Sequence, residues 1–244
     1  MRNVRLDICY DGSRYKGWQR LTDADNTIQS KLEQTLSRLL GETIEISGSG
    51  RTDAGTHAMG QVVSFHCESQ MPCDEILSGL RMYLPEDIGV YSCKNVSPRF
   101  HARLNAKTKT YRYRVWNSEN PCVFDRKYVY EDTRNLSVVD MQAAAQLFVG
   151  THDFSAFCGN KKMKKSTVRT IHEFTVTRTE NEIVFIVNGN GFLQHMVRIM
   201  VGTLLEVGCG ERTVDSIGEL FGAQRSMSGP AVPAQGLCLM EVTY

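Results

Sequence analysis

The chain has 244 residues and a formal net charge of +1, and 41% of its residues are hydrophobic and 23% charged. These proportions are typical of a globular protein with one large domain or two of ordinary size. They argue against a generally basic nucleic-acid-binding protein, so any contact with a polyanion must rest on local charge. No apolar run approaches the roughly 20 residues that a membrane-spanning helix needs, and the N-terminus lacks the apolar core of a secretory signal.

Eight cysteines occur singly along the chain, and no two of them form a C-x-x-C pair. Several fall in strand-like runs such as "GLCLMEV". This pattern predicts small buried thiols in a reducing compartment, and it favours neither a disulfide framework nor a zinc site. We therefore expect a cytoplasmic protein without a metal.

The first half of the chain alternates strand-like and helix-like patterns. The expected helix over residues 27–40 has apolar residues at helical spacing, and Gly41 is placed to end it. The expected elements follow the order of a split βαβ unit, strand, helix, strand, strand, helix, strand: residues 4–10, 27–40, 43–47, 61–65, 72–84 and 87–96.

The second half repeats this kind of alternation. Ser137 is the expected N-cap of a helix over residues 137–150, and Gly150 is its expected stop. A tight turn at residues 180–181 should join two strands, and an apolar helix should follow. The other expected elements are strands at 110–117, 170–179, 182–190 and 236–244 and helices at 192–208 and 213–222.

This pattern predicts an α+β protein with two ferredoxin-like domains, residues 1–105 and residues 106–244. Their mainly antiparallel sheets are expected side by side, with a cleft between the domains.

Basic and aromatic residues alternate in "TYRYRVW", where a strand would place Tyr111 and Tyr113 on one face and Arg112 and Arg114 on the other. Such a strand favours RNA, because cations neutralise phosphates and aromatic rings stack on unpaired bases. A second basic run, "NKKMKKSTVR", is open to two interpretations, a phosphate-binding loop or a solvated face. Its basic residues are Lys161, Lys162, Lys164, Lys165 and Arg169.

The segment "SGSGRTDAGTHAMGQ" surrounds one carboxylate with glycines. Asp53 could simply close a turn through its own backbone. It could also be a nucleophile, since Arg51 would lie on the same side of an extended chain and hold the carboxylate ionised. A helical Asp53–His57 metal pair is disfavoured by the glycines, and a structural hydrogen bond is the expected role of His57.

The helix that carries Arg198 is otherwise apolar. An unpaired arginine is costly to bury there, so we expect a carboxylate partner, with Asp53 the natural candidate if the domains face each other. "NGNGF", just before this helix, is either an anion site at the helix N-terminus or a plain turn.

Six stretches, in this order, make the chain resemble the TruA family of tRNA pseudouridine synthases: "YDGSRYKGWQ", "SGSGRTDAGTHAMGQVVSF", "FHARLNAKTKTYRYRV", "DFSAF", "GNGFLQHMVRIMVGTLLEVG" and "GLCLMEV". The resemblance covers nearly the whole chain. It implies the pseudouridine synthase fold, a homodimer without metal or organic cofactor, and a basic cleft. It also implies isomerisation of uridine to pseudouridine at positions 38, 39 and 40 of the tRNA anticodon stem-loop.

The resemblance also assigns roles to residues. It makes Asp53 the nucleophile, sets Tyr111 over the target base, places Arg51 near the flipped nucleotide and pairs Arg198 with the catalytic carboxylate. Thr56 departs from the family pattern, which usually has valine there. The expected substrate-binding residues are Tyr111, Arg51, Arg112, Lys161, Lys162, Lys164, Lys165, Arg169 and His57.

Two rival functions remain from the residues alone. One is an RNA-binding protein, such as a tRNA folding factor, in which Asp53 is structural. The other is a metal-dependent hydrolase that uses Asp53 and His57.

Overall fold

The computed structural model describes residues 1–22, 26–160 and 162–244, and the chain divides into two compact units. Unit 1 comprises Met1–Lys107 and Cys238–Tyr244, and unit 2 comprises Thr108–Leu237. The sequence pattern predicts one domain over residues 106–244. The last strand nevertheless groups with unit 1, because Cys238 and Leu239 pair in parallel with His57 and Ala58.

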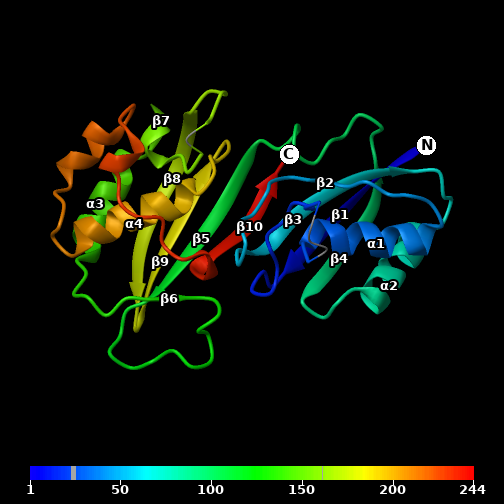
Figure 1. The fold of residues 1–244 in the computed structure, drawn as a ribbon, viewed down its shortest axis with the longest axis horizontal. Coiled ribbons are helices and arrows are strands. Elements are labelled where there is room, and N and C mark those ends of the chain that lie inside the picture. The colour runs from blue at the N-terminus through cyan, green and yellow to red at the C-terminus, as the bar shows by residue number, and fades with distance from the viewer. Residues whose placement is uncertain (23–25, 161) are drawn as a thin grey trace. The chain divides into compact units, whose positions relative to one another are not determined.

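Unit 1 is built on an antiparallel sheet with the order β4-β1-β3. Short strand β2 pairs with β3 at Ser64 and Val63, and strand β10 pairs with the opposite end of β3. This arrangement confirms the split βαβ unit. Its elements are β1 (Arg2–Tyr10), α1 (Ile28–Leu40), β2 (Ser47–Gly48), β3 (His57–Cys67), α2 (Cys73–Tyr83), β4 (Ile88–Val96) and β10 (Leu237–Thr243) (Figure 1).

Helix α1 forms as its sequence predicts. The Thr27 side chain accepts a hydrogen bond from the Ser30 backbone N–H and so caps the first turn. Leu32 and Leu36 point into the core, and Gly41 ends the helix in the left-handed region at φ 71°.

The strand expected at residues 43–47 shrinks to two residues, Ser47–Gly48. Its backbone donors bond to side chains of α1 instead of a neighbouring strand. Ile46 N–H donates to Glu33 Oε1 at 3.1 Å, and Ile44 N–H donates to Ser37 Oγ at 2.9 Å. These bonds satisfy the backbone without a sheet, so the alternating apolar pattern is buried but not strand-paired.

Unit 2 carries an antiparallel sheet with the order β5-β9-β8-β7, and short β6 runs parallel to β5. The predicted hairpin is confirmed, since Thr179 pairs with Glu182 across the two turn residues. The elements are β5 (Thr108–Trp116), β6 (Tyr130–Glu131), α3 (Val138–Leu147), β7 (Gly150–Asp153), β8 (Val168–Thr179), β9 (Glu182–Gly189) and α4 (Met196–Gly208).

Several helix boundaries in unit 2 differ from expectation. Helix α3 has the expected Ser137 cap but ends at Leu147, and Gly150 instead opens β7 at φ 119°. The segment expected as a short helix at 213–222 is a 3₁₀ helix over Asp215–Leu220.

An aromatic cluster fills the core of unit 2 beside α3. Phe148 lies 5.1 Å from Phe157 and 5.8 Å from Phe174, measured between ring centroids. Phe154 and Phe157 come from the motif "DFSAF", so that motif builds the core.

All eight cysteines are free thiols. Four of them are buried as expected, and four are only half-buried: Cys9, Cys73, Cys93 and Cys209. In the part of the chain that the structure describes, every helix is too short or too polar to cross a membrane.

Candidate active site

Asp53 lies in the loop of residues 49–56 between β2 and β3, as predicted. It starts a tight turn, because Thr56 N–H donates to the Asp53 carbonyl at 3.1 Å. Gly55 sits at the third position of this turn with φ 79°, a conformation that favours glycine. The turn fixes the backbone of Asp53, and the residue is half-buried.

The segment of residues 10–18 packs directly against this loop. A Cβ on Gly17 would lie 2.8 Å from the Thr52 carbonyl oxygen and 3.1 Å from the Asp53 carbonyl carbon. A Cβ on Gly12 would lie 2.0 Å from the Thr56 carbonyl oxygen. Only glycine therefore lets the two backbones approach this closely on either side of Asp53.

A hydrogen bond from Trp18 N–H to the Thr52 carbonyl, at 3.0 Å, adds to this contact. The motif "YDGSRYKGWQ" carries the family resemblance, but its part in the site was not predicted. The two glycines within that motif were the available signal.

Buried side chains fix the start of the loop. Gln61 Nε2 donates to the Gly50 carbonyl at 3.0 Å, and Ser49 Oγ donates to Gln61 Oε1 at 2.5 Å. The hydroxyls of Tyr10 and Thr52 are 2.8 Å apart. Burial raises the pKa of Tyr10, so its hydroxyl keeps its proton for this network.

Arg51 and Asp53 do not form the expected ion pair. Arg51 is exposed, and it has no hydrogen-bond or ion-pair partner among residues 1–22, 26–160 and 162–244. The rule that places residues two apart on one side holds for extended strands. Here the chain turns at Asp53, so that rule does not apply.

His57 is buried at the start of β3, and no helix joins it to Asp53. Its Nδ1 lies 3.1 Å from Gly12 N and 3.2 Å from Asp11 Oδ1, and it cannot accept from one and donate to the other at once. Asp11 Oδ1 already accepts two hydrogen bonds from Ser13, so we assign the bond from Gly12 N–H. This is the structural hydrogen bond expected of His57.

Tyr111 lies on β5 in unit 2 and is 7% exposed. Its ring meets Phe192 edge to face, with centroids 5.2 Å apart. The predicted alternation is confirmed, because Tyr111 and Tyr113 are buried and Arg112 and Arg114 are half-buried. Tyr113 is fully buried, its hydroxyl donates to the Pro233 carbonyl, and burial raises its pKa. Tyr113 is therefore a core residue and cannot stack on a base.

The two arginines of this strand differ in their surroundings. Arg114 donates to Glu182 at 2.5 and 2.8 Å and to Asp125 at 2.7 Å, so its charge is neutralised within the protein. The Nε of Arg112 is buried, and no described residue accepts a hydrogen bond from it. A buried unpaired donor costs about 1–3 kcal/mol, so folding alone does not explain Arg112.

Arg198 lies in the first turn of α4, and its Nε donates to the Val232 carbonyl at 2.7 Å. The helix begins at Met196, not at Phe192, because His195 takes up the left-handed conformation at φ 60°. "NGNGF" therefore does not form the helix N-terminus. Its Asn188 and Gly189 belong to β9, and Asn190 Oδ1 accepts from Thr170 N–H.

The second basic run follows the 3₁₀ turn Ser155–Phe157 and ends in β8, which carries Arg169. Lys161 lies outside the described residues. Lys162, Lys164 and Lys165 are exposed, and none pairs with an acidic side chain of the described residues. Partial burial lowers the pKa of Arg169, whose guanidinium donates to the backbone carbonyls of Ser166 and Val168.

The family model described as tRNA pseudouridine synthase matches residues 8–105 and 144–244. The chain is 46% identical over 245 residues to "tRNA pseudouridine synthase A" of Bacillus sp. (strain KSM-64), covering 100% of both chains. It is 44% identical over 245 residues to "tRNA pseudouridine synthase A 1" of Clostridium tetani, again covering 100% of both.

Among solved structures, one similar chain comes from the crystal structure of the archaeal box H/ACA sRNP Nop10-Cbf5 complex. The TM-score is 0.38 at 12% identity, covering 83% of this chain and 44% of that one. A likeness of this size supports no argument about the chain.

Proposed function

The chain belongs to the family of tRNA pseudouridine synthases, and on that premise we propose that it modifies uridines 38, 39 and 40 of the anticodon stem-loop with Asp53 as nucleophile. Membership makes it an isomerase that converts uridine in tRNA to pseudouridine. The position of the target uridine and the identity of the nucleophile are the proposed parts.

The observation that supports Asp53 as the nucleophile is the close backbone packing at two glycines beside its loop. Gly12 and Gly17 bring a second backbone segment against the loop on both sides of Asp53. The residue itself is half-buried. A loop in which Asp53 only closes a turn would not need a second backbone segment packed against it. A nucleophile needs such support, because the reaction depends on the reacting atom being held in one place.

The reaction starts with a uridine that leaves the base stack, at a cost of a few kcal/mol. The Asp53 carboxylate then attacks either the ribose C1′ or the uracil C6. The N1–C1′ bond breaks, the uracil rotates, and a C5–C1′ bond forms. In the first route the bond between Asp53 and C1′ breaks as C5 attacks, and in the second the bond between Asp53 and C6 breaks by elimination, so the carboxylate is regenerated. The C5 proton passes to a base, for which Asp53 and Tyr111 are the candidates, and N1 gains a proton. Atoms and electrons balance without an oxidant or reductant.

Other residues of the proposed site serve the same step. The Tyr111 ring holds the detached uracil, Arg198 pairs with the Asp53 carboxylate, and Arg51 lies near the flipped nucleotide. The tRNA backbone binds Arg112, whose buried Nε has no described protein partner, and the second basic run. The proposal includes a cytoplasmic homodimer and the remaining binding residues expected from the sequence, Lys161, Lys162, Lys164, Lys165, Arg169 and His57.

The test replaces Asp53 by Asn, which keeps the size of the side chain and removes the charge. Asp53→Asn is expected to abolish tritium release from C5-labelled uridine in tRNA while the Kd for tRNA stays within about threefold. Asp74→Asn, on the exposed first turn of α2, is the matched control and should behave as wild type. Near wild-type release by Asp53→Asn would overturn the assignment.

The same experiment separates the rival functions. An RNA-binding protein with a structural Asp53 would show no release in the wild type either. A metal-dependent hydrolase would lose activity in a chelator, so release that survives the chelator argues against it. Mapping pseudouridine in total tRNA, with and without the gene, would identify the modified positions.

A further inference from the structure

Arg198 is held by a part of the chain that lies far from it in sequence. Its Nε donates to the Val232 carbonyl at 2.7 Å, and Val232 N–H donates back to the Arg198 carbonyl at 3.3 Å. Val232 ends the segment of residues 228–232, "SGPAV", which we call the 228–232 segment. The direction of the Arg198 guanidinium therefore depends on where this segment runs.

Two glycines set the distance between the 228–232 segment and α4. A Cβ on Gly202 would lie 1.9 Å from the Pro230 carbonyl oxygen, and a Cβ on Gly229 would lie 2.8 Å from the Thr203 backbone. Gly202 follows Arg198 by four residues, so both lie on the same face of the helix. The backbone of the segment thus rests directly on the backbone of α4, one turn beyond Arg198.

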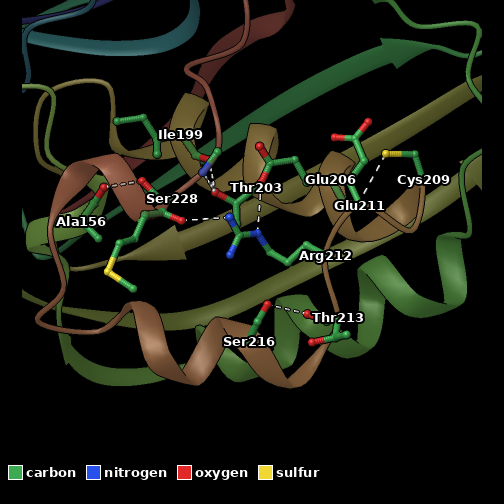
Figure 2. A network of polar contacts seen from close by, with 12 residues as sticks. Ala156, Ile199, Thr203, Glu206, Cys209, Glu211, Arg212, Thr213, Ser216 and Ser228 are labelled. Carbon is green, nitrogen blue, oxygen red and sulfur yellow. Dashed lines mark hydrogen bonds and ion pairs between the residues drawn. The ribbon is translucent and has the colours of Figure 1, made fainter.

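Polar contacts hold the segment in this position, as Figure 2 shows. Thr203 Oγ1 accepts from Gly229 N–H at 3.0 Å and donates to the Ile199 carbonyl at 2.8 Å. Ser228 Oγ donates to the Ala156 carbonyl at 2.6 Å. These groups are buried, and a lost partner there costs about 1–3 kcal/mol. The start of the segment is therefore anchored on two sides.

A third contact anchors the residue just before the segment. Arg212 donates to the Met227 carbonyl at 2.8 Å and to Glu206 Oε2 at 3.0 Å (Figure 2). Because Glu206 belongs to α4, this bridge ties the chain back to the same helix.

We propose that Gly202 and Thr203 are positioning residues for Arg198, acting through the 228–232 segment. The inference rests on the proposed role of Arg198 in the reaction. A methyl group at position 202 would displace the Pro230 carbonyl, and Val232 follows two residues later. The bond from Arg198 Nε would then lengthen or break and the guanidinium would turn. A displacement of about 1 Å in a catalytic group can lower a rate about a hundredfold.

The first test compares two glycine-to-alanine variants in the same helix. Gly202→Ala is expected to lower the single-turnover rate of pseudouridine formation at least about tenfold, with the Kd for tRNA within about twofold of wild type. Gly208→Ala is the control, since its Cβ would meet side-chain atoms of Met141 and Leu136 and not the backbone of the segment. A wild-type rate in folded Gly202→Ala would overturn the proposal.

The second test asks whether Gly202 acts through Arg198. In an Arg198→Gln background, adding Gly202→Ala should lower the residual rate no further than about twofold, because the positioned group is already gone. A full additional tenfold loss would mean that Gly202 acts by another route. If Arg198→Gln alone keeps the wild-type rate, the proposed role of Arg198 fails and the positioning inference falls with it.

A third pair keeps the proposal testable if Gly202→Ala does not fold. Thr203→Val keeps the shape of the side chain and removes the hydroxyl that accepts from Gly229. Thr203→Ser keeps that hydroxyl. We expect the rate to fall in Thr203→Val and to recover in Thr203→Ser, with Kd for tRNA unchanged in both. Equal rates in the two variants would contradict the proposal.

Discussion

Thr56 is 2% exposed, and its hydroxyl has no hydrogen-bond partner in the described ranges 1–22, 26–160 and 162–244. Valine has the same shape as threonine without the hydroxyl. We predict that Thr56→Val raises the free energy of unfolding by about 1 kcal/mol, measured by urea denaturation, because it removes an unpaired buried polar group.

Thr52 in the same loop is the control for this change. Its hydroxyl lies 2.8 Å from the Tyr10 hydroxyl, so Thr52→Val should lower the free energy of unfolding by about 1 kcal/mol. If the free energy of unfolding changed in the same direction in both variants, the unpaired hydroxyl of Thr56 would not be the cause of the change.

Single residues also show how far sequence reasoning reaches. The period of a strand correctly separated Tyr111 and Tyr113 from Arg112 and Arg114. It could not show that Tyr113 is covered by the chain around Pro233, or that Glu182 neutralises Arg114. Those partners come from distant parts of the sequence, and periodicity carries no information about them.

Among the elements, the loop of Asp53 depends on a segment that is itself irregular. Gly17 has φ 90° and meets the backbone of this loop, whereas Gly41 has φ 71° and meets nothing within 4 Å. Both replacements by alanine incur the left-handed backbone penalty of about 1–2 kcal/mol. Gly17→Ala adds a clash with the loop, so we predict a fall of about tenfold or more in the rate of pseudouridine formation.

Gly41→Ala is the control, since it should lower the stability of the protein and leave the rate of pseudouridine formation at the wild-type value. Rates would be compared in single turnover with saturating enzyme, and stability by thermal unfolding. If the two variants show the same rate, the contact between Gly17 and the loop has no part in the reaction.

The elements that the sequence predicted well are those whose ends are marked locally. Helix α1 has its cap at Thr27 and its stop at Gly41. The prediction of a strand at residues 43–47 was wrong, because the backbone N–H groups of this segment donate to the side chains of Glu33 and Ser37 in α1. The predicted start of α4 was wrong, because His195 adopts a left-handed backbone conformation. Histidine does not by itself predict that conformation.

At the scale of the whole molecule, the net charge of +1 conceals an uneven distribution. Arg114 is neutralised by acidic neighbours, whereas Lys162, Lys164 and Lys165 pair with no acidic side chain in the described part of the chain. We predict that replacing these three lysines by glutamine weakens tRNA binding. The slope of log K against log salt should become shallower by about 2 to 3, since each phosphate contact contributes about 0.9.

The matched control replaces the same number of cations elsewhere, at Lys31 and Arg38 of α1 and Lys94 of β4. Its slope should stay at the wild-type value. Filter binding or fluorescence anisotropy over a salt series would measure both. An unchanged slope in the first triple variant would show that its lysines face solvent even when tRNA is bound.

The assignment of residues 238–244 to unit 1 has a consequence for how the chain is made. Unit 1 is interrupted in sequence by unit 2, which is one uninterrupted stretch. During synthesis, all residues of unit 2 are therefore made after Lys107 and before Cys238 and Leu239, the partners of His57 and Ala58. The strand that begins with His57, four positions after Asp53, can gain this parallel neighbour only after the whole of unit 2 has been synthesised.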